Sequence, residues 1–337
     1  MASVFDLVRY GGPPAPSLAA APHAWRVDPL VLAAVLVAAG GYLFGVWRVR
    51  RAGGQWPVAR TLAFFGVGLV ALAATTMGWL GVYAPVLFSA YAMQVVALLM
   101  VVPLLLALGR PIELAKAALG PAGSARLDTV LHSRPARLFT VPVVSPLLLA
   151  LIPFLVFFTP WYQATLQHPV LASLTHLALL LAGLAVLVPI WEADTIAAPV
   201  PYLLALMFAL IELLADAVPG IVIRLDTHVI AGAYLATLGR PWGGSLLHDQ
   251  QLGGDFLWCI GEAVDVPFLG LLLLQWVRAD AREARRVDEA LDVAGADGGT
   301  GAPGDEDGGF GVERPWWETD ASVFGDRAAQ FQRRDHD

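Results

Sequence analysis

The chain has 337 residues, of which 57% are hydrophobic and 15% charged, with a formal net charge of −7 and a mean hydropathy of +0.65. A soluble domain carries nearer a quarter of charged residues, so the bulk of this chain is expected in a lipid bilayer. The acidic balance gives no reason to expect a nucleic-acid partner. A single cysteine excludes an internal disulfide, a CxxC metal site and an all-cysteine iron–sulfur site.

Seven apolar runs approach the roughly 20 residues that a bilayer core requires. Backbone groups in lipid have no water to bond, so each run is predicted to be a helix, and none alternates like a barrel strand. The predicted fold class is an all-α integral membrane protein, a seven-transmembrane-helix bundle over residues 29–277. The spans are expected near residues 29–47, 61–83, 86–108, 139–158, 170–191, 200–223 and 253–277.

Basic residues predict the orientation of this bundle. They gather in residues 48–60, 110–137 and 278–286, and these three segments share one side only if there are seven spans. The positive-inside rule makes that side cytoplasmic. The N-terminus, with the external segment 1–28, is then outside, and the C-terminus is cytoplasmic.

The segments after the last span are polar. Residues 278–292 are predicted to continue as a cytoplasmic helix, and residues 293–312 form a disordered linker by composition. The tail 313–337 carries Trp316 and Trp317, which suggest a docking contact. No P-loop and no GxGxxG after a strand is present, so the chain is not expected to be an enzyme.

The intramembrane polar residues cluster at the depth of the predicted outer half. A charge at bilayer depth costs about 2.5–3.5 kcal/mol on insertion scales, so such residues are expected to face the bundle interior. Candidates for a proton or polar network are Tyr91, Gln94, Asp255 and Asp265. Candidates for holding a metal ion are Met93, His176, Glu212, Asp216, Cys259 and Glu262.

Each of these residues also has a structural interpretation. No arginine or lysine lies within the spans, so the acids are expected to be protonated, to share protons or to bind a cation. Glu262 can be a protonated side chain hydrogen-bonded between helices, and Asp255 a carboxylate that favours a helix start. Cys259 can be a small core residue, Met93 can serve packing, and His176 can bond at the interface.

The stretch DQQLGGDFLWCIGEAVDVPFLGLLLLQWVRADAREARRVDEALD, residues 249–292, resembles the last helix of CtaG-type cytochrome c oxidase assembly factors of bacteria. That helix has an Asp-Gln-Gln, Gly-Gly, Trp and Gly-Glu series followed by an arginine-rich exit. Stretches of the first, third, fourth and fifth predicted helices, and ERPWWETD in the tail, also resemble this family, in its actinobacterial form. The matching motif residues are Asp249, Gln250, Gly253, Gly254, Trp258, Gly261 and Glu262.

The resemblance implies a multi-pass protein of the bacterial plasma membrane, with the lipid bilayer and cytochrome c oxidase subunits as partners. It further implies a role like that of a metallochaperone, maturing a copper-containing oxidase through copper supply. The family's third helix usually carries His-Met-x-x-His, whereas this chain has Tyr-Ala-Met-Gln-Val at residues 91–95. His176 matches a family histidine on the fifth helix. Cu(I) prefers soft thiolate or thioether ligands and also accepts imidazole.

Three functions are therefore open. The chain is an oxidase assembly factor that handles copper at the outer half of the membrane, or a metal-free scaffold or accessory subunit of the oxidase, which the missing histidines favour. The third possibility is a proton- or cation-coupled transporter, since intramembrane acids often carry ions. Glu212, Asp216 and Glu262 would be its carriers.

Overall fold

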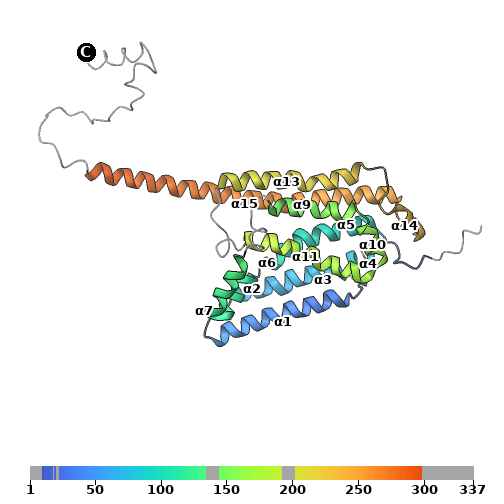
Figure 1. The fold of residues 1–337 in the computed structure, drawn as a ribbon, viewed down its shortest axis with the longest axis horizontal. Helices are drawn as coiled ribbons and strands as arrows, with labels where there is room; N and C mark the ends of the chain where they lie inside the picture. The colour runs from blue at the N-terminus through green and yellow to red at the C-terminus, as the bar shows by residue number, and fades with distance from the viewer. Residues whose placement is uncertain (1–9, 18, 20–22, 134–143, 192–201, 298–337) are drawn as a thin grey trace, which may run out of the picture. The chain divides into compact units, whose positions relative to one another are not determined.

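The computed structural model describes residues 10–17, 19, 23–133, 144–191 and 202–297, and these ranges contain helices and no strand. Figure 1 shows the helices with their labels. Their bounds are α1 Pro29–Arg51, α2 Val58–Leu62, η2 Ala63–Leu69, α3 Val70–Thr76, α4 Trp79–Tyr83, α5 Phe88–Val96, η3 Ala97–Val101, α6 Val102–Ala107, α7 Pro111–Leu131, α9 Val144–Phe157, α10 Trp161–Gln167, α11 Pro169–Trp191, α13 Tyr202–Leu225, α14 Gly232–Thr237 and α15 Leu246–Asp297.

The first helix has clear start and stop signals in the sequence. The Asp28 carboxylate accepts hydrogen bonds from the backbone N–H groups of Leu30 and Val31, and Pro29 occupies the first helical position. This cap satisfies donors that a helix start leaves free. Three arginines in the last turn suit the negative end of the helix dipole.

Two of the long helices contain π-helical turns. Residues 58–76 run through α2, η2 and α3, and residues 88–107 run through α5, η3 and α6. A π turn inserts an extra residue and changes which side chains face the neighbouring helix. Gly78 then adopts an extended conformation that separates α3 from α4.

The all-α class is confirmed, and so are several of its spans. Four helical stretches are long and apolar enough to cross a membrane: Pro29–Arg51, Val58–Tyr83, Phe88–Ala107 and Pro169–Val188. A fifth candidate is broken, because Leu149–Phe157 and Trp161–Gln167 meet at 65°. The sixth and seventh predicted spans fall on α13 and α15, where several side chains are outside the described residues, and they stay predictions.

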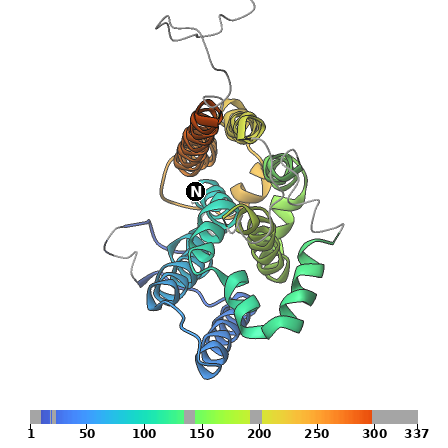
Figure 2. The ribbon, with the colours of Figure 1, turned by 90° about the vertical axis from the view of Figure 1, so that its left-hand side faces the viewer.

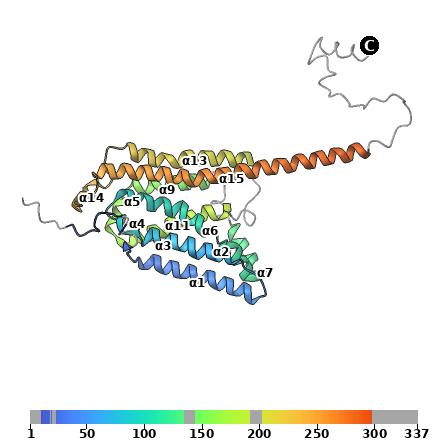
Figure 3. The same cartoon turned by 180° about the vertical axis from the view of Figure 1, so that it is seen from behind.

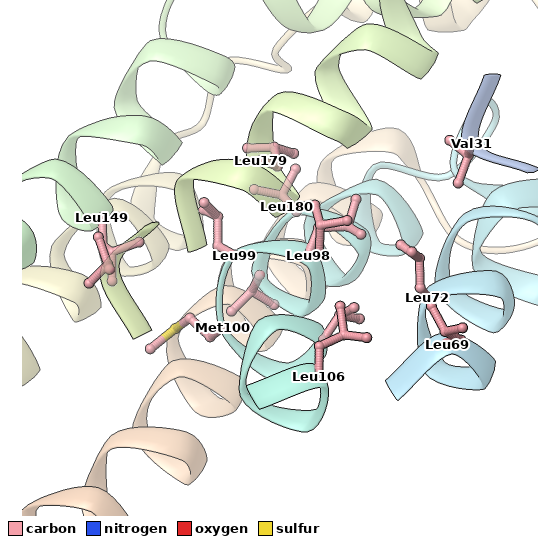
Figure 4. Packing of buried hydrophobic residues seen from close by; sticks show 14 of the residues in the cluster. Val31, Leu69, Leu72, Leu98, Leu99, Met100, Leu106, Leu149, Leu179 and Leu180 are labelled. Carbon is pink, nitrogen blue, oxygen red and sulfur yellow. The ribbon is translucent and has the colours of Figure 1, made fainter. Parts of the chain in front are cut away.

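The stretch Phe88–Ala107 is the centre of the bundle. In it 72% of the most apolar window is buried, against 22–33% in the three other unbroken spans. Figure 2, seen along the helices, shows it between α1 on one side and α13 with α15 on the other. Figure 4 shows Leu98, Leu99 and Met100 meeting side chains of α3, α9 and α11. The outer helices therefore keep apolar faces for lipid.

A polar and aromatic cluster ties the short loops together at one end of the bundle. Glu113 of α7 forms ion pairs with Arg60 at 2.7 Å and Arg110 at 3.1 Å. The Tyr42 hydroxyl donates to the Gly109 carbonyl, and the Trp56 indole N–H donates to Tyr42. Two arginine-bearing segments thus share one end, as the orientation argument requires. Which end faces the cytoplasm stays a prediction.

Glu113 makes stability depend on pH. Burial raises its pKa, but hydrogen bonds and charge from Arg60 and Arg110 outweigh burial and hold the pKa below its ordinary value. A lowered folded-state pKa stabilises the fold above the ordinary value, and this contribution is lost as pH falls through the folded value. We expect Glu113→Gln to lower the melting temperature in detergent at neutral pH. The loss in free energy of unfolding should be about 1 kcal/mol or less, because the group is partly exposed.

As the pH falls through the lowered folded-state pKa of Glu113, the melting temperatures of Glu113→Gln and the parent protein should converge, since the carboxylate becomes protonated there. Asp280→Asn, on the exposed part of α15, is the control and should change little at neutral or acid pH. A Glu113→Gln effect that persists unchanged in acid would contradict this account of the cluster.

Residues up to Asp280 form one compact unit, and Ala281 begins a second. α15 continues as a helix to Asp297 and so includes residues 278–292. Residues 298–337, with most of the predicted linker and the whole Trp316–Trp317 tail, lie outside the described residues. The domain boundaries and the cytoplasmic location of these segments stay predictions.

Candidate functional site

A polar cavity lies within the helix bundle, at the end opposite the Glu113 cluster. Its volume is about 150 Å³, and α1, α5, α10 and α11 contribute to its lining. A water needs roughly 10–15 Å³ by this kind of measure, so the space exceeds that of a single water. Its lining includes the polar side chains of Asp28, Tyr91, Gln94, Thr165, Ser173 and His176.

Hydrogen bonds across three helices fix the imidazole of His176. The Gln94 side-chain N–H donates to the Thr75 carbonyl at 2.8 Å, which leaves the Gln94 amide oxygen facing His176. This oxygen lies 3.1 Å from His176 Nε2. An amide oxygen only accepts, so Nε2 carries the hydrogen. In the neutral imidazole, Nδ1 then holds the lone pair.

Asp28 lies on the other side of the imidazole. Its Oδ2 is 3.6 Å from His176 Nδ1 and accepts a hydrogen bond from the Ser173 hydroxyl at 2.7 Å. Burial raises the pKa of Asp28, but the interactions with His176, Ser173 and the Val31 N–H outweigh it and hold the pKa well below its ordinary value. Asp28 is therefore a carboxylate, and His176 Nδ1 is buried without a hydrogen bond.

A hydroxyl pair and aromatic rings form the neighbouring wall. The Tyr91 and Thr165 hydroxyls are 3.0 Å apart, and Thr165 also donates to the Tyr162 carbonyl. The rings of Tyr91 and Tyr162 meet edge to face with centroids 4.7 Å apart. Such aromatic pairs contribute beyond their buried area, so this wall of the cavity is rigid.

The structure brings together only some of the predicted site residues. His176, Gln94 and Tyr91 line the cavity, whereas Met93, Cys259 and Glu262 are not among its lining residues. Cys259 is exposed, and Glu262 accepts a hydrogen bond from Trp258 one turn earlier on α15. Asp255 is paired with Arg224 at 2.9 Å. The side chains of Glu212, Asp216 and Asp265 are outside the described residues.

The residues around His176 do not fit a closed copper site. Among the described residues no group of three or more His, Cys, Asp and Glu side chains could hold a metal ion. Next to the His176 imidazole stands a carboxylate, which suits Cu(I) poorly, and no thiolate or thioether is part of the set described above. The cavity offers one imidazole nitrogen, His176 Nδ1, that makes no hydrogen bond to the described residues.

The motif residues at the start of α15 hold other segments in place. Asp249 accepts hydrogen bonds from the Phe88 and Ser89 backbone N–H groups and from the Ser89 hydroxyl. It thereby caps α5 from a distant part of the chain. Gln250 accepts from the Ile230 N–H and donates to the His228 carbonyl, so it fixes the loop before α14.

The motif glycines allow helices to approach closely. A Cβ on Gly254 would lie 2.6 Å from the Gly220 carbonyl oxygen of α13, and one on Gly253 would lie 2.5 Å from the Phe88 ring. Trp258 contacts Gly220 from the same side, with its backbone N 2.9 Å from a Cβ placed there. By contrast, a Cβ on Gly261 meets no described atom within 4 Å. Gly253 and Gly254 therefore serve packing.

Asp28, Ser173 and Thr165 belong to the site but were not predicted from the sequence. Asp28 had a signal, because an Asp-Pro pair before an apolar run predicts a helix cap. Its second role, facing His176, had none, since the contact joins the start of α1 to α11. Small hydroxyl residues in apolar helices give no signal by themselves.

An apolar helix bundle with a polar cavity at one end defines a multi-pass helical membrane protein. Over residues 40–279 the sequence matches the cytochrome c oxidase caa3 assembly factor family (Caa3_CtaG), and the chain belongs to this family. The resemblance of its last helix is thereby confirmed.

Mycobacterial proteins are among the relatives of this chain. A Mycobacterium leprae protein described as uncharacterized is 32% identical over 282 residues, which are 81% of this chain and 42% of that protein. Uncharacterized proteins of Mycobacterium bovis and Mycobacterium tuberculosis are each 30% identical over 297 residues, 86% of this chain and 44% of theirs. The chain thus spans less than half the length of these relatives. No solved structure matches it.

Proposed function

We propose that the chain assists the assembly of a copper-containing cytochrome c oxidase from within the bacterial plasma membrane, as a non-enzymatic partner of oxidase subunits. The observation that carries this proposal is the family match, which covers the helical region at residues 40–279. The role that the geometry supports best is that of a membrane-embedded scaffold. Asp249, Gln250 and Gly254, which carry the family motif, hold helices and a loop in fixed positions.

Copper handling is a second candidate function, with copper as cargo at the predicted outer half. It is favoured by one observation, the buried Nδ1 of His176 that lacks a hydrogen bond and faces Asp28 at 3.6 Å. An imidazole nitrogen of this kind is an acceptable Cu(I) ligand. The exposed Cys259 is not part of the cavity lining, so a copper ion at His176 would need further ligands from a partner protein.

Purification from the native membrane tests the assembly role. Tagged full-length protein is isolated in mild detergent from wild-type cells, and from cells carrying the Gly254→Ala variant as a control with disturbed packing. We expect an oxidase subunit to co-purify, and deletion of the gene to reduce assembled oxidase. Oxidase assembled in normal amount with its full copper content in the deletion strain would refute the proposal.

Copper binding separates the two modes of action. The purified protein is loaded with Cu(I) under reducing conditions, and the copper retained against a competing chelator is measured per chain. His248→Ala, at an exposed position in the first turn of α15, is the matched control for His176→Ala. Stoichiometric copper that is lost only in His176→Ala supports copper handling. No retained copper together with a co-purified oxidase subunit supports the scaffold.

A further inference from the structure

A second cluster of buried residues is separate from the main core and shares none of its side chains with the lining of the His176 cavity. It is built on Tyr83, Val86, Leu87 and Ala90, around the loop between α4 and α5. Trp79, Leu238 and Trp242 pack against it, together with Tyr10 of the N-terminal segment. Figure 3 shows the N-terminal segment at the same end of the bundle as α4 and α14.

Three aromatic residues of this cluster, Trp79, Tyr83 and Trp242, form what we call the aromatic platform. The ring of Tyr83 lies 5.0 Å from that of Trp79 and 6.0 Å from that of Trp242. Arg240 lies over the Trp242 ring at 5.1 Å. Two hydrogen-bond donors, the Trp242 indole N–H and the Tyr83 hydroxyl, are thus held on rigid neighbouring rings.

A proline-rich segment of the same chain is seated on this platform. Residues 10–17 read YGGPPAPS, and this segment is not helical. Trp242 Nε1 donates to the Pro13 carbonyl at 3.1 Å, and the Tyr83 hydroxyl donates to the Pro14 carbonyl at 3.0 Å. The Tyr10 ring meets the Trp242 ring edge to face at 6.0 Å.

This pattern of contacts has a defined chemistry. Proline has no backbone N–H, so a Pro-Pro pair offers only its carbonyl oxygens and its rings. Aromatic surfaces that carry fixed N–H and O–H donors recognise such segments, because the proline backbone is already stiff and loses little entropy on binding. The platform presents two such donors to successive proline carbonyls.

The resident segment leaves one polar atom unsatisfied. The Tyr10 hydroxyl is buried and makes no hydrogen bond to the described residues, whereas Arg240 is paired with Asp249 at 3.6 Å and donates to the Gly244 carbonyl. Each buried group without a partner costs about 1–3 kcal/mol. A ligand with an apolar ring at the position of Tyr10 would avoid this cost.

We infer that the aromatic platform is a docking site for proline-rich protein segments, and that residues 10–16 occupy it as a displaceable internal ligand. The partner is a protein on the side that the arginine pattern predicts to be outside. Its segment carries a Pro-Pro pair whose carbonyl oxygens accept from the Trp242 indole N–H and the Tyr83 hydroxyl, as those of Pro13 and Pro14 do. This inference does not depend on the proposed assembly function.

The test uses a fluorescent peptide with the sequence YGGPPAPS and full-length protein in detergent. In the variant Pro13→Gly/Pro14→Gly the internal ligand is weakened, because two glycines raise the entropy of the free segment. We expect saturable binding of the peptide to this variant, at least about 10-fold tighter than to the parent protein, whose platform is occupied. The peptide YGGAAAAS is the control ligand.

Two conservative changes then probe the platform in the Pro13→Gly/Pro14→Gly background. Trp242→Phe and Tyr83→Phe keep a ring and remove one donor each, so each should weaken peptide binding by about 2- to 10-fold. Both variants are first checked for an unchanged melting temperature. Binding that is absent from the glycine variant, or that neither substitution weakens, overturns the inference. The oligomeric state of the parent protein is measured as well. A dimer that Trp242→Phe disrupts would assign the platform to the N-terminus of a second copy, and would overturn the assignment to a partner.

Discussion

Replacing Asp249 by alanine is expected to destabilise the protein by about 3–5 kcal/mol, a typical cost of breaking a buried ion pair. The side chain is nearly buried, and it is paired with Arg240, whose Nη1 lies 3.6 Å away. Alanine would leave this guanidinium without its carboxylate and the first N–H groups of α5 without a cap. The lost cap acts on the central helix of the bundle, and the unpaired guanidinium on the loop before α15.

The measurement is the midpoint of unfolding in detergent, followed by circular dichroism. Asp255→Ala on the same helix is the matched control, because that carboxylate forms a pair with Arg224 in which both side chains are 41–45% exposed. An exposed pair contributes about 0–1 kcal/mol. If both variants lose the same amount of stability, Asp249 is not the cap described above.

The second large effect is expected for Gly254→Ala. A Cβ at this position would lie 2.6 Å from the Gly220 carbonyl and 2.7 Å from the Arg224 backbone nitrogen. Both are backbone atoms of α13, so no side chain can rotate away, and the helices must separate. Overpacking of this kind costs about 1–3 kcal/mol and occasionally more.

Gly261→Ala on the same helix is the matched control for this change. Within the part of the chain that the structure describes, its Cβ meets nothing within 4 Å, and alanine is favoured over glycine in a helix by up to about 1 kcal/mol. We therefore expect opposite signs for the two substitutions in the same unfolding assay. A stabilising Gly254→Ala would show that α13 and α15 do not cross at Gly220.

The spans were readable from sequence because a bilayer core demands length and apolarity over the same residues. The predicted ranges 29–47, 86–108 and 170–191 each fall within a few residues of a span-length helix. Breaks within helices were harder to predict. The extended Gly78 and the bend between α9 and α10 arise from packing between helices, which hydropathy does not report.

Depth in the membrane was also readable, but rotation about each helix axis was not. Gln94 and His176 were placed in one layer, and they meet at 3.1 Å. Cys259 and Glu262 were placed in the same layer, yet they do not line the cavity. Which side chains of a layer meet depends on the rotation of each helix about its axis, and in the stretch Phe88–Ala107 the π turns of η3 change that rotation along the helix.

The motif residues show a different gap between sequence and structure. Asp249 and Gln250 match the family signature, but nothing in their spacing predicts what they bind. Their partners, Phe88 and Ile230, lie in other parts of the chain. A polar residue near a helix start predicts a cap for its own helix, whereas Asp249 caps another one.

The cap on α5 has a consequence for the time course of synthesis. Phe88 and Asp249 are 161 residues apart, and a ribosome adds roughly 5–20 residues per second. The N–H groups of Phe88 and Ser89 therefore lack this cap for roughly 8–30 s during synthesis. The cap forms only once the start of α15, which carries Asp249, has been made. A chain that stalls before that moment carries an unfinished centre, which a membrane protease can distinguish from the completed protein.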